Sequence, residues 1–354
     1  MENRKIGYAV LGLGIGMAHA EAAAASEHAE LVAVCDLDES RLQKAAALYP
    51  SAKLYRDAAA LFADPNVDIV SICLPSGMHA DYAVMAMEAG KHVLVEKPID
   101  ITCRRAARIE EARLRTGMRC GVVLQNRFNL NMYPIRRALA EGRLGNLFLG
   151  TFAVKWYRDQ RYYDRGGWRG TWEMDGGGSL INQASHTVDL MQWLMGEPVS
   201  VSSKTAIADH RIETEDTTVS TLRFKNGALA TFVSTTCAYP GVSTEICLYG
   251  TEGSIEADAD RLKLWKMKTP AGEWDEDEEE EIMLERYGKG NRVAAAAEGK
   301  LYGHRYVVED MILAVRDGRD PAVLPREAMK SLAIIEAIYR SEKWDTCADV
   351  RFGD

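Results

Sequence analysis

Residues 5–16 read Lys5-Ile6-Gly7-Tyr8-Ala9-Val10-Leu11-Gly12-Leu13-Gly14-Ile15-Gly16, an apolar run followed by three closely spaced glycines. The run predicts a short buried strand, and the alanine-rich residues 17–26 predict a helix. A glycine turn between strand and helix lets the backbone approach a pyrophosphate, whose charge binds free N–H groups at the helix N-terminus. We therefore expect a dinucleotide site at Gly12, Gly14, Ile15 and Gly16.

A second apolar run, residues 31–35, ends in Asp36. An acid about 20 residues beyond the glycines holds a ribose 2′-hydroxyl and repels a 2′-phosphate, which favours NAD over NADP. Arg41 is the nearby residue that could favour NADP. The third glycine stands at 16, whereas the usual spacing would put it at Met17, so the prediction depends on the surrounding strand, helix, strand and acid.

Residues 6–25 also resemble a signal peptide, because they are mostly apolar and follow basic residues. The stretch nevertheless contains His19, Glu21 and the glycine turn, and it leads into a further βαβ pattern. These features argue against a signal peptide.

The composition describes a globular chain of 354 residues, 47% hydrophobic and 27% charged, long enough for two domains. No apolar run approaches a membrane span once the glycine turn is set aside. The seven cysteines show no CxxC spacing and stand mostly in apolar runs, so a reducing, cytoplasmic location is expected.

The net charge of −9 comes mostly from one acidic run, Glu273 with residues 275–281. Such a run predicts a solvated loop or hairpin tip, with a cation or partner site as the alternative. No part of the chain is basic enough to predict binding of nucleic acid.

The first third of the chain alternates between strand and helix patterns, with strands at 67–74, 92–96 and 119–124 and helices at 79–89 and 103–116. This alternation predicts an α/β domain with a doubly wound parallel sheet over residues 1–124, which would bind the cofactor at its carboxyl edge. Leu74, Pro75 and His79 belong to one loop at that edge, and Glu96 and Lys97 belong to another.

Residues 125–354 follow a different pattern, with two-fold alternation at 147–157, 199–208, 217–224, 228–237, 244–249 and 262–268 and a hairpin signal at Asn226-Gly227. We expect an α+β domain built on a large open, mainly antiparallel sheet. Helices at 179–195, 304–317 and 326–341 would cover one face. The uncovered face predicts a homodimer or homotetramer, so this domain would bind substrate and join subunits.

Lys97 follows a strand pattern and precedes a proline, which keeps Lys97 out of the α-region and could permit a cis bond. A lysine at the edge of a cofactor crevice can donate a hydrogen bond to a substrate hydroxyl and stabilise a developing alkoxide. The alternative is a solvated loop lysine.

Asn182, His186 and Asp189 follow a triple glycine at 176–178 and would share one face of a helix. A lone histidine on a helix is more often a buried structural residue, but here its neighbours on the face are polar. Histidine titrates near neutrality and suits a general base, so His186 and Asn182 are predicted catalytic residues. Asn182 is a poor metal ligand and no further ligand has suitable spacing, so no metal site is expected.

The segment from Trp156 to Trp172 is dense in Trp, Tyr and Arg. Aromatic faces pack against sugar C–H groups, and arginines bind hydroxyls, phosphates or carboxylates. An arm wrapping another subunit is an equal alternative for residues 156–165. Trp168 and Arg169, nearest the glycines, are the better site candidates.

These motifs make the chain resemble the glucose-fructose oxidoreductase, inositol dehydrogenase and MocA family over nearly its whole length. The motifs are Gly12-x-Gly14-x-Gly16-x-x-His19, Glu96-Lys97-Pro98, Asn126-Arg127-Phe128, Trp168-Arg169-Gly170-Thr171-Trp172, the segment 175–189 and Gly303-His304-Arg305. The resemblance implies a Rossmann domain, a sheet domain, and hydride transfer between NAD(P) and a ring carbon of a sugar or cyclic polyol.

The resemblance also implies roles for particular residues. Lys97 and His186 would handle the proton, and the nicotinamide end would be lined by Glu96, Lys97, Asn126, Trp168, Arg169 and His304. Inositol dehydrogenases usually carry aspartate at the position of Asn182, which makes plain inositol a doubtful substrate. A cofactor-binding regulator without catalysis and a sugar–sugar oxidoreductase with tightly held cofactor stay open as alternatives.

Overall fold

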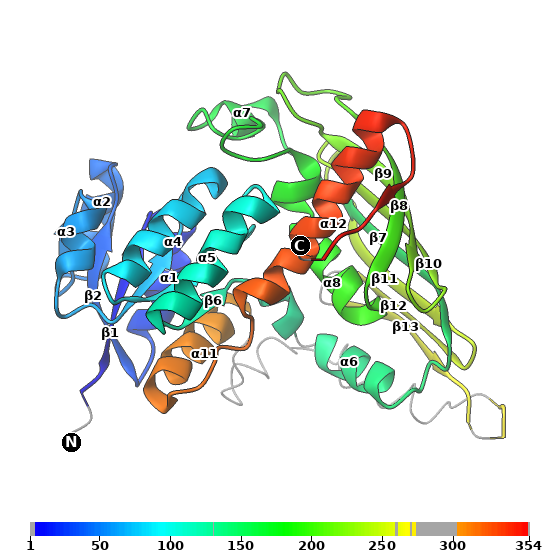
Figure 1. Ribbon diagram of the computed structural model, residues 1–354, viewed down its shortest axis with the longest axis horizontal. Helices are drawn as coiled ribbons and strands as arrows, with labels where there is room; N and C mark the ends of the chain where they lie inside the picture. The colour runs from blue at the N-terminus through cyan, green and yellow to red at the C-terminus, as the bar shows by residue number, and fades with distance from the viewer. Residues whose placement is uncertain (1–3, 130, 259–260, 270, 274–302, 353–354) are drawn as a thin grey trace. The chain divides into compact units, whose positions relative to one another are not determined.

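The computed structural model describes residues 4–129, 131–258, 261–269, 271–273 and 303–352 (Figure 1). Backbone contacts divide the chain into two units, Met1–Gln125 with Tyr302–Met329 and Asn126–Leu301 with Lys330–Asp354. We refer to them as unit 1 and unit 2. Within the acidic run, residues 275–281 lie outside the described residues.

Unit 1 contains a six-stranded sheet in which every pairing is parallel. Its order is β3 (Lys53–Tyr55), β2 (Ala29–Cys35), β1 (Ile6–Leu11), β4 (Ile69–Ile72), β5 (His92–Val95) and β6 (Cys120–Val122). The helices are α1 (Gly16–Ala24), α2 (Glu39–Leu48), α3 (Ala58–Ala63), α4 (His79–Glu88), α5 (Cys103–Thr116) and α11 (Gly303–Asp317). The predicted doubly wound α/β domain is confirmed.

The ends of these helices follow from local side-chain chemistry. The Asp38 carboxylate accepts the Ser40 N–H at 2.9 Å before α2, and the Thr102 hydroxyl accepts the Arg105 N–H at 3.3 Å before α5. Both residues satisfy backbone donors that a helix start leaves unpaired. Gly117 ends α5 with φ of +69°, a conformation that glycine adopts without strain.

Residues 303–329 belong to the same unit as the first sheet, although the sequence assigned residues 125–354 to the second domain. Val308, Met311 and Ile312 on α11 are fully buried, and the Val122 N–H donates to the Val323 carbonyl at 3.1 Å beside β6. The 3.6-residue period reveals an apolar face on this helix but cannot reveal which sheet the face covers.

Unit 2 contains an eight-stranded sheet. Its order is β13 (Arg261–Met267), β12 (Gly253–Asp258), β11 (Ser243–Gly250), β7 (Leu147–Lys155), β10 (Leu229–Thr235), β9 (Thr217–Phe224), β8 (Pro198–Ala206) and β14 (Ala348–Asp349). Only β7 and β10 pair in parallel; the other neighbours are antiparallel. The predicted mainly antiparallel sheet is confirmed, with Gly227 at φ of +89° in the predicted hairpin turn.

The helices of unit 2 are α6 (Met132–Ala140), α7 (Gln160–Asp164), α8 (Ser185–Met195) and most of α12 (Pro325–Trp344). Along β9 and β10 the side chains alternate: Phe224 and Phe232 are buried, whereas Val219 and Leu229 on the other face are 51% and 46% exposed. One sheet face therefore belongs to the core and the other stays open. Among the described residues, no helix is both long and apolar enough to cross a membrane.

Candidate active site

The three glycines of the first turn differ in the physical reason why a side chain is absent at each position. Gly12 has φ of +92°, and a Cβ there would lie 2.4 Å from the Cys73 carbonyl oxygen. A Cβ on Gly16 would lie 2.7 Å from a Val10 methyl, so Gly16 lets α1 pack closely on β1. Gly16 therefore supplies the close packing that the usual third glycine supplies one position later.

Gly14 differs from its neighbours because the space over it is open. The nearest atom to a Cβ on Gly14 would be the Arg41 Nη1 at 3.9 Å. The protein itself does not require glycine here, whereas a pyrophosphate approaching the backbone would. This open backbone at the start of α1 fits a dinucleotide.

Asp36 lies directly after β2, as predicted, and its carboxylate is held by the first turn. It accepts the Leu13 N–H at 2.6 Å and the Asp38 N–H at 2.8 Å. The Arg41 guanidinium lies 3.4 Å from the Asp36 carboxylate and 3.5 Å from that of Asp38. Two carboxylates thus surround the cation that could have favoured NADP, in keeping with a preference for NAD.

His79 connects the two loops at the carboxyl edge of the sheet. Its ring nitrogens lie 2.9 Å from the Leu74 carbonyl oxygen and 2.7 Å from the Pro98 carbonyl oxygen. The sequence predicted His79 as a cofactor contact; in the structure its buried ring lies between these two carbonyls and links the loops.

Glu96 is a buried carboxylate that supports Lys97. It accepts the Lys97 N–H at 2.9 Å, and its other oxygen lies 3.0 Å from the His19 Nε2 and 3.4 Å from the His304 Nε2. Burial opposes ionisation, but hydrogen bonds from both histidines outweigh it and hold the pKa of Glu96 well below its usual range. The Lys97–Pro98 peptide bond is cis.

Within the described part of the chain, two groups of side chains have ligand atoms close enough to hold a metal ion: His19 with Glu96 and His304, and His210 with Asp216 and Cys237. In the second group, the His210 Nδ1 lies 3.0 Å from the Asp216 carboxylate and its Nε2 lies 2.8 Å from the Arg158 carbonyl oxygen. Asp216 also accepts backbone N–H groups of residues 208–210. These atoms bind one another, as in a hydrogen-bonded structural network.

The turn at the triple glycine is filled by the protein itself. A Cβ on Gly178 would lie 1.8 Å from the Glu215 carbonyl oxygen, and one on Gly177 would lie 2.0 Å from the Tyr339 hydroxyl. Glycine is required here because a strand start and a tyrosine approach the backbone.

The predicted helix over 179–195 is two elements. Ser179–Gln183 forms a π-helical turn, η3, in which the Ala184 N–H donates to the Ser179 carbonyl, and α8 begins at Ser185. The change of period means that Asn182 and His186 do not follow the i, i+4 spacing of one α-helix. His186 lies in the first turn of α8 and is 8% exposed.

Asn182 has both ends of its amide hydrogen-bonded. Its Nδ2 donates to the Asp175 carboxylate at 2.5 Å, and its Oδ1 accepts from the Gln183 Nε2 at 2.9 Å. Asp175 in turn accepts the Gly170 N–H at 2.8 Å. This arrangement suits a residue that fixes positions and does not suit a proton relay.

Asp189 lies three residues after His186 in α8, and its carboxylate is paired with an arginine. The Arg127 guanidinium binds its carboxylate through two hydrogen bonds of 2.7 Å, in a buried bidentate pair. The pair fixes α8 to the segment η2 (Gln125–Phe128), which also contains Asn126. Asp189 is therefore structural.

The aromatic and arginine side chains of residues 156–169 stack on one another. The Arg158 guanidinium lies 5.1 Å from the Trp156 ring and 5.4 Å from the Tyr162 ring, and the Arg169 guanidinium lies 4.8 Å from the rings of both Tyr162 and Trp168. Cation–π contacts therefore occupy faces that the sequence suggested for sugar packing. The Arg158 Nη2 also donates to the Gln183 side chain at 2.9 Å, which ties the stack to η3.

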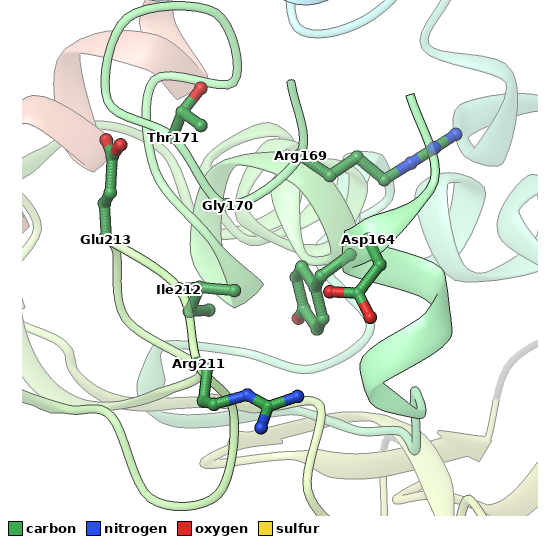
Figure 2. A pocket seen from close by; sticks show the side chains of 8 residues that line it. Asp164, Arg169, Gly170, Thr171, Arg211, Ile212 and Glu213 are labelled. Carbon is green, nitrogen blue, oxygen red and sulfur yellow. The ribbon is translucent and has the colours of Figure 1, made fainter. Parts of the chain in front are cut away.

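A pocket of about 390 Å³ opens beside this stack, lined by Tyr163, Asp164, Arg169, Gly170, Thr171, Arg211, Ile212 and Glu213. Figure 2 shows Glu213 and Thr171 at one side, Asp164 and Arg211 at the other, and Ile212 between them. Asp164 is the last residue of α7, whereas Arg169, Arg211 and Glu213 come from loops of unit 2. Of these residues, the sequence singled out Arg169.

Sequence reasoning missed Glu215 and Tyr339. The Glu215 carboxylate accepts the Gly178 N–H at 3.0 Å, the Leu180 N–H at 2.8 Å and the Tyr339 hydroxyl at 3.1 Å. The sequence places Glu215 just before the strand pattern at 217–224. Acids are common at exposed strand ends, so this position alone does not indicate a buried carboxylate. Tyr339 stands 124 residues further along the chain, so no local pattern joins the two.

Comparisons with known proteins agree with this geometry. Residues 6–124 match the model of an oxidoreductase family with an NAD-binding Rossmann fold, and residues 134–256 match the GFO/IDH/MocA C-terminal domain. Myo-inositol 2-dehydrogenase of Thermotoga maritima is 28% identical over 255 residues, which cover 70% of this chain and 74% of the relative.

Two crystal structures match the whole chain. The WlbA dehydrogenase from Bordetella pertussis, in complex with NADH and UDP-GlcNAcA, superposes with a TM-score of 0.88 and 33% identity over 100% of both chains. The WlbA dehydrogenase from Chromobacterium violaceum, with the same two molecules, gives a TM-score of 0.88 and 30% identity over 100% of this chain and 98% of the other. The predicted fold, family resemblance and NAD cofactor are confirmed.

Proposed function

Because the chain belongs to the GFO/IDH/MocA family of oxidoreductases, we propose that it is an NAD-dependent dehydrogenase that acts on a ring carbon of a sugar derivative. The observation that carries the proposal is the carboxyl edge of the unit 1 sheet. There the open backbone at Gly14, the acid Asp36 and the supported Lys97 follow β1, β2 and β5. In parallel sheets of this kind, ligands bind at this edge.

NAD, when bound, supplies the nicotinamide that accepts or returns a hydride. The residues proposed to hold it are Gly12, Gly14, Ile15, Gly16 and Asp36, with Leu74, Pro75, Asn126, Trp168, Arg169 and His304 as further contacts. In this proposal Lys97 donates a hydrogen bond to the substrate hydroxyl and stabilises negative charge on its oxygen. The Glu96 carboxylate fixes the Lys97 backbone by accepting its N–H.

His186 is proposed as the general base that removes the hydroxyl proton during oxidation and returns it during reduction. A positioned base typically contributes about 10²–10⁴-fold to the rate. Asn182 is proposed to orient the site, because Asp175 and Gln183 engage both ends of its amide.

The proposed substrate class is an anionic sugar derivative such as a nucleotide-linked sugar acid. Two whole-chain relatives, 33% and 30% identical to this chain, were crystallised with UDP-GlcNAcA, whereas the matching inositol dehydrogenases are 28% and 26% identical. Arg169 and Arg211 line one pocket, and among the described residues the buried Arg169 Nε has no hydrogen-bond partner. An unpaired buried guanidinium N–H favours an acceptor such as a carboxylate or phosphate.

A panel of matched substrates tests the function. UDP-GlcNAcA, UDP-GlcNAc and myo-inositol are incubated with NAD, and NADH formation is followed by fluorescence. We expect the highest kcat/KM with the sugar acid. Absence of turnover with every sugar, from protein that carries no bound NADH, would contradict catalysis. Protein that copurifies with NADH, and whose NADH is oxidised by a keto sugar, would instead behave as a sugar–sugar oxidoreductase.

We further propose that copies of the chain join through the open face of the unit 2 sheet as a dimer or tetramer. Val219 and Leu229 expose apolar surface in the middle of that face, on strands that pair with each other. Light scattering should show an oligomer, and Val219→Glu should shift it toward monomer. A wild-type monomer would contradict the proposal. Six of the seven cysteines are buried or partly buried, which suits small buried thiols and supports a cytoplasmic location in the same proposal.

A further inference from the structure

Glu215 is a buried carboxylate that the proposed chemistry does not use. It lies just before β9, is 3% exposed, and faces the triple-glycine turn of unit 2. Three donors converge on its two carboxylate oxygens: the Gly178 N–H, the Leu180 N–H and the Tyr339 hydroxyl, at 2.8–3.1 Å. The Ser179 hydroxyl lies 3.5 Å away.

The carboxylate satisfies backbone donors that η3 cannot satisfy by itself. The first N–H groups of a helical turn have no intrahelical partner and are usually capped by the side chain of the preceding residue. Here that residue is Gly178, which has no side chain and makes no such bond. Glu215 supplies the missing acceptors from another element of the fold.

Glycine at 178 follows from the same contact. The Ser179 N–H donates to the Glu215 backbone carbonyl at 3.0 Å. The main chain and the side chain of Glu215 therefore both accept hydrogen bonds from this turn. Any Cβ at Gly178 would overlap that carbonyl. Glycine at position 178 therefore allows the backbone of the turn to approach Glu215 closely.

The turn held by Glu215 leads directly to the residues of the proposed site. Asn182 stands two residues beyond Leu180, and the Ala184 N–H donates to the Ser179 carbonyl immediately before α8. A shift of the Gly178–Leu180 backbone would therefore move Asn182 and the start of α8, which contains His186. Misplacing a catalytic group by about 1 Å can cost on the order of 10²-fold in rate.

The surroundings of Glu215 are sensitive to its charge. Burial raises its pKa to about 7, although the backbone N–H groups and Tyr339 oppose that rise. Burial also raises the pKa of Tyr339 well above its usual range, and the Glu215 and Asp175 carboxylates add to this effect. Asp216 adjoins Glu215 in sequence, and its own pKa is lowered because the N–H groups of residues 208–210 outweigh burial. A protonated Glu215 would lose acceptor capacity that the turn requires.

We propose that Glu215, assisted by Tyr339, is a positioning residue for the site: its carboxylate holds the Gly178–Leu180 turn and thereby places Asn182 and His186. This inference rests on the proposed roles of those two residues. It makes the ionised carboxylate the competent form, so activity falls when Glu215 takes up a proton.

Two variants and one control test the proposal. Glu215→Gln keeps the side-chain shape but directs an NH₂ group at a backbone N–H. We expect kcat to fall about 10-fold or more with an unchanged NADH dissociation constant, and the acid limb of the pH profile to lose one ionisation. Tyr339→Phe removes one donor, which should shift that limb to higher pH while the plateau is kept. Tyr55→Phe, which removes a 2.8 Å bond to Asp64 in unit 1, is the control and should leave the profile unchanged.

A pH profile identical to wild type in the Tyr339→Phe variant would overturn the proposal, even if Glu215→Gln does not fold. A second readout does not depend on turnover. The Trp172 ring contacts Tyr339 edge-on at 5.3 Å, so the fluorine NMR signal of fluorotryptophan at this position, assigned with Trp172→Phe, should change with pH near neutrality. That change should move to higher pH in Tyr339→Phe, and its absence in wild type would refute Glu215 positioning whether or not any sugar is oxidised.

Discussion

The molecule contains two glycine-rich turns that begin helical segments, and the two serve opposite purposes. At Gly14 the space above the backbone is open, whereas at Gly178 a Glu215 oxygen occupies the position where a Cβ would be. The first turn leaves room for something outside the chain, and the second is fitted to the chain itself. Glycine in a sequence thus indicates a close approach without identifying the atom that approaches.

The sharpest test of this difference is Gly178→Ala. A Cβ 1.8 Å from a backbone oxygen forces the main chain to move, and overpacking of this kind typically costs about 1–3 kcal/mol, with more where backbone must shift. We expect a loss of about 3 kcal/mol or more in the free energy of unfolding, measured by urea denaturation. A fully stable variant would mean that the second turn is as open as the first.

The second prediction concerns the charge beside that turn. The pKa of Glu215 is raised from 4.5 to about 7 in the folded protein, so its protonated form favours folding. This contribution is fully present below pH 4.5 and is lost as pH rises through 7. The wild type should therefore lose up to about 3 kcal/mol of unfolding free energy relative to Glu215→Gln over that range.

Urea denaturation at several pH values measures this difference. Glu213→Gln, which alters an exposed acid two residues away, is the control and should show no comparable slope. A flat difference between wild type and Glu215→Gln would contradict a titrating carboxyl under the turn.

Residues proposed to act on the substrate should leave both turns intact. Lys97→Ala and His186→Ala should each lower kcat by about 10²-fold or more, because a positioned proton-transfer or hydrogen-bonding group is lost. NADH affinity, measured by fluorescence titration, should change little. Lys97→Arg should not restore activity, since a planar guanidinium does not replace a compact ammonium. Full activity of either alanine variant would remove that residue from the mechanism.

The smallest expected effect is at the open turn. Gly14→Ala meets no atom closer than 3.9 Å, so folding stability should stay within about 0.5 kcal/mol of wild type. NADH binding should nevertheless weaken, by about 10-fold, because a methyl group would occupy the approach of the pyrophosphate. Unchanged binding would show that the first turn does not receive the cofactor.

Cofactor choice extends the same test. Asp36→Ser together with Leu37→Arg should narrow the preference for NAD over NADP, since the repelling carboxylate is replaced by a cation. Asp36 also accepts the Leu13 N–H, so some loss of NADH affinity is expected as well. Comparable wild-type affinities for NAD and NADP in calorimetric titration would contradict the role assigned to Asp36.

The sequence by itself determined the features that depend on neighbours in the chain. Strand, glycine turn, helix and Asp36 follow one another within about 30 residues, and their spacing is enough to predict a parallel sheet that binds a dinucleotide. Two-fold alternation likewise predicted the open sheet of unit 2, because each strand shows its buried face in its own residues. The sequence predicts Lys97 as a site residue for the same reason, because it comes shortly after a strand.

Only the tertiary structure decided features that depend on residues far apart. The sequence could not show that α11 packs in unit 1, that His79 is held by two carbonyls, or that Asp189 binds Arg127. The strongest case is Glu215 with Tyr339, because Glu215 binds the start of a π-helical turn that stands where the sequence predicted a continuous α-helix. A buried backbone N–H must find an acceptor, and tertiary packing decides which residue supplies it. Glu215 and Tyr339 are 124 residues apart in the sequence, so no local pattern predicts their contact.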